Sequence, residues 1–217
     1  MSFGLSRGRE LDVSGWGIDR AELPPFEAGP IDPRGWFARP EQPLEIEIGS
    51  GKGTFLLQEA RARPEVNLLG IEWAKEFWRY AADRLRRHGL PNVRLLHDDA
   101  TEFIRHRLPS AIVRTIHLYF SDPWPKTRHH KRRVVQEASL RDFHRVLEPG
   151  GAIHLVTDHD ELWAWYEEHA HRAADLFERR PFAPPASATG EEVVGTNFER
   201  KYRREGRPFH AMTLARR

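Results

Sequence analysis

"LEIEIGSGKG", residues 44–53, joins a short apolar run to a glycine-rich turn and decides the fold class. An apolar run of this length predicts a strand, and the amphipathic residues 53–62 predict a helix directly after the turn. This alternation continues along the chain and is typical of βαβ units, so we expect an α/β fold with a mostly parallel sheet and right-handed crossovers. The expected strands are 44–48, 67–71, 92–96, 114–120, 151–157, 175–180 and 208–214, and the expected helices are 53–62, 74–88, 100–107, 131–147 and 160–173.

Two segments depart from this rhythm. Residues 1–40 are rich in glycine and proline and show neither a period of 2 nor one of 3.6, so we expect an N-terminal arm before a single regular domain at 41–217. Residues 181–207 form a long connection before the last expected strand. Long connections inside compact domains are usually functional, so we expect 181–207 to have a functional role.

Composition narrows the class of protein. The 217 residues are 39% hydrophobic and 30% charged, and no apolar run approaches the roughly 18 residues of a membrane helix. The chain has no cysteine and opens without a secretory leader, so we expect a cytoplasmic protein with no thiol chemistry. The net charge is only +2, but basic residues cluster at 126–133 and 200–207. Each cluster is either a solvated face or a binding site for a polyanion.

The glycine turn and the acids after the strands outline a ligand site, because parallel α/β sheets bind ligands beyond the carboxyl ends of their strands. Gly49 and Gly51 would let a ligand approach the backbone, although a plain tight turn explains them equally well. The turn is not a phosphate-binding Walker motif, since Gly53 stands where Ser or Thr would hold magnesium. Glu72 ends the second strand at a spacing that suits a ribose acceptor, or else it favours the start of the next helix.

Two further acids belong to the same predicted edge. Asp99 follows the third strand and either accepts from an adenine amino group or caps the next helix. Glu47 lies inside a strand that should be covered on both faces, where an unpaired carboxylate is costly, so we expect it to meet a ligand. These residues predict an adenosine pocket but do not distinguish a dinucleotide from S-adenosylmethionine.

The fourth strand makes that distinction, because it ends in Asp122-Pro-Trp-Pro125. Methyltransferases that act on amines and bases often place an acid, prolines and an aromatic residue here, and dehydrogenases need no such element. An aromatic ring can stack on a base, a contact worth about 1–3 kcal/mol. The stretch therefore favours S-adenosylmethionine as the cofactor and a nucleic-acid base as the substrate.

With these residues in view, the chain resembles the bacterial tRNA (guanine-N(7)-)-methyltransferases over about 43–214. The resemblance rests on EIGSGKG, GIE, DDA, the TD after the fifth strand, TNFERKY and, above all, FSDPWPKTRHHKRRVVQ. Ser121 stands where a proline is expected, and residues 1–40 do not match. The resemblance implies a Rossmann-like class I methyltransferase with a seven-stranded, mostly parallel sheet flanked by helices and an antiparallel last strand.

The resemblance also implies the reaction and the residues that serve it. The methyl group would pass from S-adenosylmethionine to N7 of guanine 46 in the tRNA variable loop, with Asp122 as the catalytic residue. The implied cofactor residues are Glu47, Gly49, Gly51, Glu72, Asp99 and Asp122; the substrate residues are Lys126, Asp158, Thr196, Asn197, Phe198 and Glu199; and the RNA-binding residues are Arg128, His129, His130, Lys131, Arg132 and Arg133.

The chemistry of guanine refines these roles. N7 carries a lone pair and no proton, so its methylation needs alignment and not a general base. Asp122 would stabilise the developing positive charge, and Asp158 or Glu199 would recognise the opposite edge of the base. We expect no metal site, because the adjacent His129 and His130 do not easily reach one ion. A monomer or a homodimer is compatible with the sequence.

Two other functions remain open at this point. A related base methyltransferase could act on an exocyclic amine through a similar acid-proline-aromatic loop. A non-catalytic RNA-binding module could keep the fold without the cofactor. These alternatives differ in the position of the methyl group and in cofactor binding, respectively.

Overall fold

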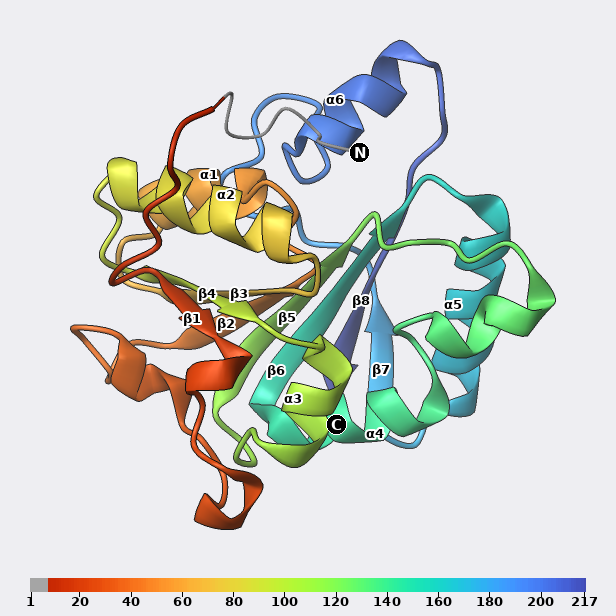
Figure 1. Cartoon of the computed structure of the whole chain (residues 1–217). Helices are drawn as coiled ribbons and strands as arrows, with labels where there is room; N and C mark the ends of the chain where they lie inside the picture. The colour runs from red at the N-terminus through yellow and green to blue at the C-terminus, as the bar shows by residue number, and fades with distance from the viewer. Residues whose placement is uncertain (1–7) are drawn as a thin grey trace. The chain divides into compact units, whose positions relative to one another are not determined.

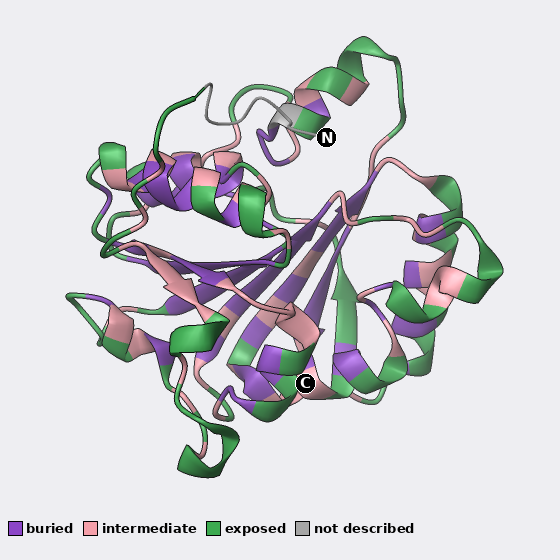
Figure 2. Cartoon of the chain, in the orientation of Figure 1, coloured by how far each residue is buried: buried purple, intermediate pink, exposed green. Residues whose placement is uncertain are grey.

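The computed structural model describes residues 8–217 and divides the chain into two compact units, Met1–Leu108 and Pro109–Arg217. The strands are largely buried, except for residues 17–19, which are intermediate, and residues 178–180, which are exposed, and most helices bury one side only (Figure 2). The seven expected strands all form, within a few residues of their expected bounds. An eighth strand, which we did not expect, comes from residues 17–19.

The first unit holds four parallel strands in the order β1-β4-β3-β2. Both Asp19 and Glu72 stand opposite His97 in the strand register, so the carboxyl ends of β1, β3 and β4 are level. This level edge positions the loops that carry the predicted cofactor residues. The strand bounds are β1 (Gly17–Asp19), β2 (Leu44–Ile48), β3 (Asn67–Glu72) and β4 (Val93–His97).

Three helices flank these strands. Helices α1 (Thr54–Ala62) and α2 (Lys75–Arg87) lie on one face, and α3 (Ala100–His106) lies on the other (Figure 1). Gly53 precedes α1 in the left-handed conformation, with φ at +65°. A Cβ atom on Gly53 would come within 3.1 Å of the Ala81 Cβ, so this glycine also allows α1 to pack closely on α2.

The described part of the arm packs within the first unit. The buried carboxylate of Asp83 on α2 accepts a hydrogen bond from Arg9 at 2.6 Å and pairs with Arg86 and Arg87 of its own helix. Trp16 donates its indole N–H to the Leu90 carbonyl at 2.7 Å. These contacts bring β1 alongside β4, whereas the pattern of residues 1–40 alone predicts no regular element.

The second unit holds four strands in the order β5-β6-β8-β7. β5 and β6 are parallel, and β8 is antiparallel to both of its neighbours, which confirms the expected reversal of the last strand. The fold class is therefore the predicted α/β class. The strand bounds are β5 (Val113–Tyr119), β6 (Leu147–Thr157), β7 (Phe177–Arg180) and β8 (His210–Arg216).

The helices of this unit are α4 (Glu137–Val146), α5 (Asp160–Arg172) and α6 (Asn197–Arg204). The expected helix at 131–147 was too long, because residues 127–132 form a separate 3-10 helix, η4. Ser139 accepts a hydrogen bond from the backbone N–H of Gln136 at 2.9 Å and so fixes the later start of α4. Helix α6 lies inside the long connection at 181–207, where we expected no helix.

Candidate active site

The loop after β2 has the backbone that an approaching ligand requires. Gly49 and Gly51 adopt φ values of +77° and +52°, which side chains disfavour. A Cβ atom added to either glycine would meet nothing within 4 Å, so the space over the turn is open. The glycines therefore serve both the turn and the access to its backbone.

Glu72 at the end of β3 holds this turn in place. One carboxylate oxygen accepts from the Gly51 N–H at 2.8 Å, and the other accepts from the Ala74 N–H at 2.8 Å. The side chain thus ties the glycine turn to the loop that leads into α2. Both oxygens of a carboxylate can accept further bonds, so these contacts leave capacity for a ligand hydroxyl.

Glu47 at the end of β2 carries a carboxylate that the described residues leave partly unsatisfied. The residue is 5% exposed, and its Oε2 has no hydrogen-bond partner within the part of the chain that the structure describes. Burial, with the nearby charge of Glu72, raises the pKa of Glu47 to about 8. A ligand that brings a cationic or hydrogen-bond-donating group would satisfy this oxygen.

Asp99 is the N-cap of α3. Its Oδ1 accepts from the backbone N–H groups of Thr101 at 2.8 Å and Glu102 at 3.2 Å. Of the two alternatives left open by the sequence, capping is therefore present, and a ligand contact through the same carboxylate stays a prediction. The neighbouring Asp98 accepts from the Asp99 N–H at 2.8 Å, and burial raises its pKa.

Trp73 and Arg20 also lie at this edge, and no sequence pattern singled them out. Trp73 follows Glu72 and is 61% exposed, and the Arg20 guanidinium lies 5.3 Å from the centre of its ring. Arg20 comes directly after β1, so only the pairing of the arm with β4 brings it here. An exposed tryptophan beside a predicted ribose acceptor adds a flat apolar surface to the site.

The second unit presents the Asp122–Pro125 turn after β5. Asp122 is exposed, and Ser121 shares a hydrogen bond of 2.8 Å with the hydroxyl of Tyr166 on α5. Trp124 adopts φ of +44°, which is unusual for a bulky residue and costs conformational energy. A side chain in this conformation needs support from its surroundings.

The indole ring of Trp124 is framed by two basic residues of η4. The Arg132 guanidinium lies 4.8 Å from the ring centre, and the His129 ring meets it edge-on at 5.8 Å. Arg132 keeps its charge exposed while it contacts the ring. The predicted aromatic surface and the first cations of the basic segment are therefore one continuous feature.

The predicted RNA-binding residues fall into three groups. Arg128, Lys131 and Arg132 are exposed cations, as is the predicted substrate residue Lys126. The two histidines at 129 and 130 are partly buried beside tryptophan rings. Arg133 differs from the others, because it is 2% exposed and its guanidinium already binds other groups of the protein.

The predicted substrate residues of α6 have distinct surroundings. Glu199 is fully buried, and its carboxylate accepts from the backbone N–H groups of Val193, Val194 and Gly195 at 2.6–2.8 Å. Burial acts to raise its pKa, but these donors and Arg203 hold the pKa below its usual value. Glu199 therefore organises the loop before α6, which is a structural role that the sequence did not predict.

The other residues of this group differ in exposure, from the buried Thr196 to the exposed Phe198. Thr196 caps α6 by accepting from the Glu199 N–H at 3.1 Å, and Phe198 is 53% exposed. Asp158, after β6, pairs with Arg207 at 2.7 Å. The predicted contact of the Asn197 side chain lies outside the described residues.

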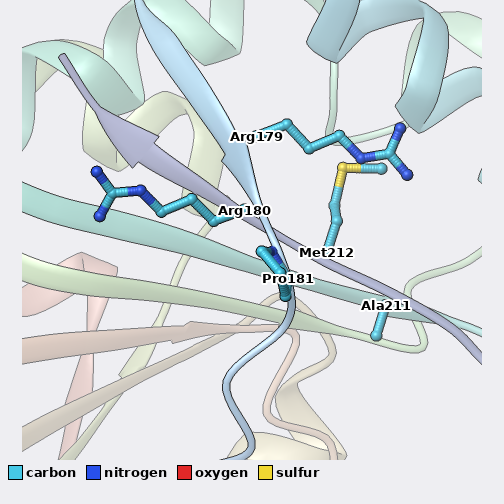
Figure 3. Close-up of a pocket in the computed structure, with 5 residues that line it drawn as sticks. All are labelled: Arg179, Arg180, Pro181, Ala211 and Met212. Atoms are coloured by element: carbon cyan, nitrogen blue, oxygen red, sulfur yellow. The ribbon is translucent and has the colours of Figure 1, made fainter.

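A hollow of about 370 Å³ lies at β7 and β8, between Arg179, Arg180 and Met212 (Figure 3). The two arginine side chains point to opposite sides of the strand, so they do not converge on one ligand (Figure 3). Each is ion-paired, Arg179 with Glu167 and Arg180 with Glu178. The residues that line this hollow include none of the predicted site residues.

Residues 8–217 contain no group of three or more acidic or histidine side chains placed to hold a metal ion. Within the same range, no helix has the length and apolar character needed to cross a membrane.

The α/β fold, with parallel strands in both units and an antiparallel β8, is that of a class I methyltransferase. Residues 41–212 match a family model described as "Putative methyltransferase". The chain belongs to the tRNA (guanine-N(7)-)-methyltransferase family. It is 37% identical to the tRNA (guanine-N(7)-)-methyltransferase of Halorhodospira halophila, over 95% of this chain and 88% of that protein. The protein of that name from Nitrobacter hamburgensis is 35% identical, over 94% and 82%.

Solved structures support the same fold at lower identity. The 16S rRNA methyltransferase KamB aligns with a TM-score of 0.56 and 18% identity, over 81% of this chain and 87% of that chain. The aminoglycoside resistance methyltransferase NpmB1 aligns with a TM-score of 0.53 and 16% identity, over the same shares. At these identities the likeness concerns the fold alone.

Proposed function

We propose that this protein transfers the methyl group of S-adenosylmethionine to N7 of guanine 46 in the variable loop of tRNA. The observation that carries the proposal is the similarity, over 95% of the chain, to a tRNA (guanine-N(7)-)-methyltransferase. The exposed Asp122 beside the framed ring of Trp124 supports it from the structure. Because tRNA is the substrate, the cytoplasm is the compartment in which we expect the protein to act.

The first unit offers groups that fit the donor. Glu47 would receive the ammonium of the methionine part at its unsatisfied oxygen, and that cation would favour the ionised form of the carboxyl. Glu72 would accept from the ribose hydroxyls while it holds Gly51, and the open space at Gly49 would admit the ligand. Asp99 would accept from the adenine amino group. When bound, the sulfonium of the donor supplies an electrophilic methyl group.

The reaction at guanine requires a nucleophile that is already deprotonated. The N7 lone pair meets this requirement, so no residue has to remove a proton before the methyl group is transferred. Positive charge then develops on the imidazole ring of guanine. We assign Asp122 to stabilise that charge, because a carboxylate fixed before the reaction lowers the barrier without reorganisation.

Recognition of the RNA would use the accessible residues of the second unit. Lys126, Arg128, Lys131 and Arg132 would neutralise phosphates and set the register of the RNA without reading its sequence. The exposed ring of Phe198 and the half-buried ring of Trp124 are available for stacking.

Of the two acids considered for the guanine edge, the geometry favours Asp158. Glu199 already accepts three backbone hydrogen bonds and an ion pair with Arg203, whereas Asp158 pairs with the exposed side chain of Arg207. A guanine N1–H and amino group could replace Arg207 at this carboxylate. Thr196 and Asn197 would complete the substrate side through α6.

The test is methyl transfer to defined tRNA. Unmodified tRNA is incubated with labelled S-adenosylmethionine, and the product is digested to nucleosides. We expect N7-methylguanosine, with label lost when guanine 46 is replaced by 7-deazaguanine, which lacks the nucleophile but keeps the rest of the base. Methyl groups on an exocyclic amine would support the related base methyltransferase instead. No heat in calorimetry with S-adenosylmethionine at millimolar concentration would support the non-catalytic module.

A further inference from the structure

Arg133 differs from the other cations of its segment in being buried. Its side chain is 1% exposed, whereas the side chain of its ion-pair partner Glu161 is 50% exposed. A buried guanidinium must have its charge and its N–H groups satisfied by the protein, because desolvation is otherwise costly. The contacts of Arg133 show where those groups are used.

The guanidinium bridges the Asp122–Pro125 turn and helix α5. Its Nε donates to the Pro123 carbonyl at 2.8 Å, and one terminal nitrogen donates to the Glu161 carboxylate at 2.5 Å. The same terminal nitrogen lies 3.5 Å from the Trp124 carbonyl. Two consecutive carbonyls of the turn therefore face one fixed cation.

Helix α5 also contacts Arg133 and the residues after it through Trp165. Trp165 lies one helical turn after Glu161, and the Arg133 guanidinium stacks 4.8 Å from the centre of its ring. The Trp165 indole N–H donates to the Val135 carbonyl at 2.6 Å, so the ring also holds the chain just after Arg133. The guanidinium holds the pKa of the Glu161 carboxyl below its usual value, which keeps the partner ionised.

The turn needs such a support because of its backbone. Trp124 has φ of +44° and is followed by a proline, a combination that few conformations satisfy. A bulky residue persists in this region only where its surroundings fix it. The contacts of Arg133 with the carbonyls of Pro123 and Trp124 act directly on the peptide groups that flank the strained residue.

We propose that Arg133 is a positioning residue that holds the Asp122–Pro125 turn in the geometry needed for methyl transfer, and that it does not bind RNA. The inference rests on the proposed function, since the reaction it serves is that methyl transfer. It assigns opposite roles to two adjacent arginines. Arg132 contacts solvent and the Trp124 ring, and Arg133 fixes the backbone that carries the ring and Asp122.

Three variants test this role. Arg133→Lys keeps a charge that can pair with Glu161 but cannot also donate along the direction of Nε to the turn. Arg133→Gln removes the charge, and Glu161→Gln removes the charge of the partner while keeping its size. The control is Arg172→Gln, because Arg172 at the other end of α5 also forms ion pairs, with Glu168 of the same helix and Glu137 of α4.

Kinetics and binding give the first readout. We expect Arg133→Lys and Arg133→Gln to lower kcat about 10-fold to 30-fold while the KM for tRNA changes less than about 2-fold, as for a loss of alignment. The salt dependence of tRNA binding should match that of the wild type. A kcat within about 2-fold of the wild type in both variants would overturn the proposal. The slope of log K for tRNA binding against log salt concentration is the second criterion. A slope smaller in magnitude by about 1 would also overturn the proposal, because that change indicates the removal of one phosphate contact.

Limited proteolysis gives a readout that does not need activity. Trypsin should cut after Lys126 and Arg128 about 10-fold faster in Arg133→Gln than in the wild type, at an unchanged rate in the first unit. If that variant does not fold, Glu161→Gln is expected to show about 3-fold faster cleavage and a kcat about 3-fold lower. Wild-type cleavage and kcat in a folded Glu161→Gln protein would contradict the inference. A wild-type protein without methyl transfer would instead remove the proposed function, and the proteolysis result would still stand.

Discussion

Each unit buries an ionisable side chain near its predicted site, Glu47 in the first and Arg133 in the second, and the two side chains differ in how well the protein satisfies their polar atoms. In the first unit, Glu47 is buried with one oxygen unsatisfied among the described residues, and its pKa is raised to about 8. In the second unit, buried Arg133 is paired with Glu161 and bonded to the turn. The difference supports the proposal that a ligand would complete the first region, whereas the contacts of the second region are present without one.

Of the changes that test this comparison, loss of the Asp122 carboxylate should have the largest effect, and the effect is on kcat. We expect Asp122→Asn to lower kcat at least about 100-fold, as for the removal of one electrostatic contact to the transition state. Binding of tRNA should change little, because the exposed cations remain. The measurement is single-turnover transfer to tRNA, with Asp175→Asn, another exposed acid of this unit, as the control. A wild-type rate in Asp122→Asn would show that the preassembled turn is not catalytic.

The second test concerns the close packing around Gly70 of β3, beneath the glycine turn, and its contribution to stability. A Cβ atom at Gly70 would lie 2.4 Å from the Ser50 Oγ and 2.5 Å from a methyl carbon of Leu56. We expect Gly70→Ala to lower the free energy of unfolding by about 2–3 kcal/mol through overpacking, measured by urea denaturation. Gly35→Ala is the control, since nothing lies within 4 Å of the Cβ position there and φ is ordinary. Equal stability of the two variants would mean that β3 and the turn are loosely packed.

The unsatisfied carboxyl group of Glu47 predicts that the free energy of unfolding depends on pH. Because the pKa of Glu47 is about 8 in the folded protein, against an ordinary value of 4.5, the folded state binds the extra proton between those values. The contribution of Glu47 to stability should therefore fall as pH rises from about 5 to about 8, by at most about 1.4 kcal/mol per pH unit.

The measurement is the free energy of unfolding of the ligand-free protein across this range, compared with Glu47→Gln, which cannot titrate. S-adenosylhomocysteine, which keeps the amino group of the donor, should reduce the difference between the two proteins. Identical pH profiles would show that Glu47 is already satisfied in the free protein.

The smallest expected effect concerns the exposed cations. Replacing Lys131 and Arg132 with alanine should lower the salt slope of tRNA binding by about 2, because each side chain is expected to neutralise one phosphate. Arg180→Ala serves as the control, because Arg180 is an exposed cation paired with Glu178 on β7. An unchanged slope in the double variant would show that these two side chains are solvated surface residues that do not contact the RNA.

Much of the fold was predictable because its signals are local. The seven expected strands are short apolar runs, and the parallel pairing of β2 with β3, β3 with β4 and β5 with β6 follows from the helices between them. β1 escaped prediction because three residues, Gly17–Asp19, are too few to show a period, and their pairing depends on distant contacts such as that of Arg9 with Asp83. α6 escaped because its sequence, NFERKYRR, has almost no apolar face.

The site was predictable in residue type but less so in role. Glu47, Glu72 and Asp122 are where parallel strands should place them, at carboxyl ends. Arg132 and Arg133 are chemically identical neighbours, and only the 3-10 helix η4, which ends at Arg132, decides which one faces α5. Roles set by such a choice require the structure, since neither charge nor spacing distinguishes the two residues.

The strand β1 also affects how the first unit behaves toward other molecules. It pairs with one side of β4 over only three residues, and it is the edge strand of the order β1-β4-β3-β2. A longer uncovered border would expose a row of amide and carbonyl groups to which foreign chains can add. The arm therefore protects this unit from association through its edge, and a protein shortened to remove β1 would be expected to aggregate.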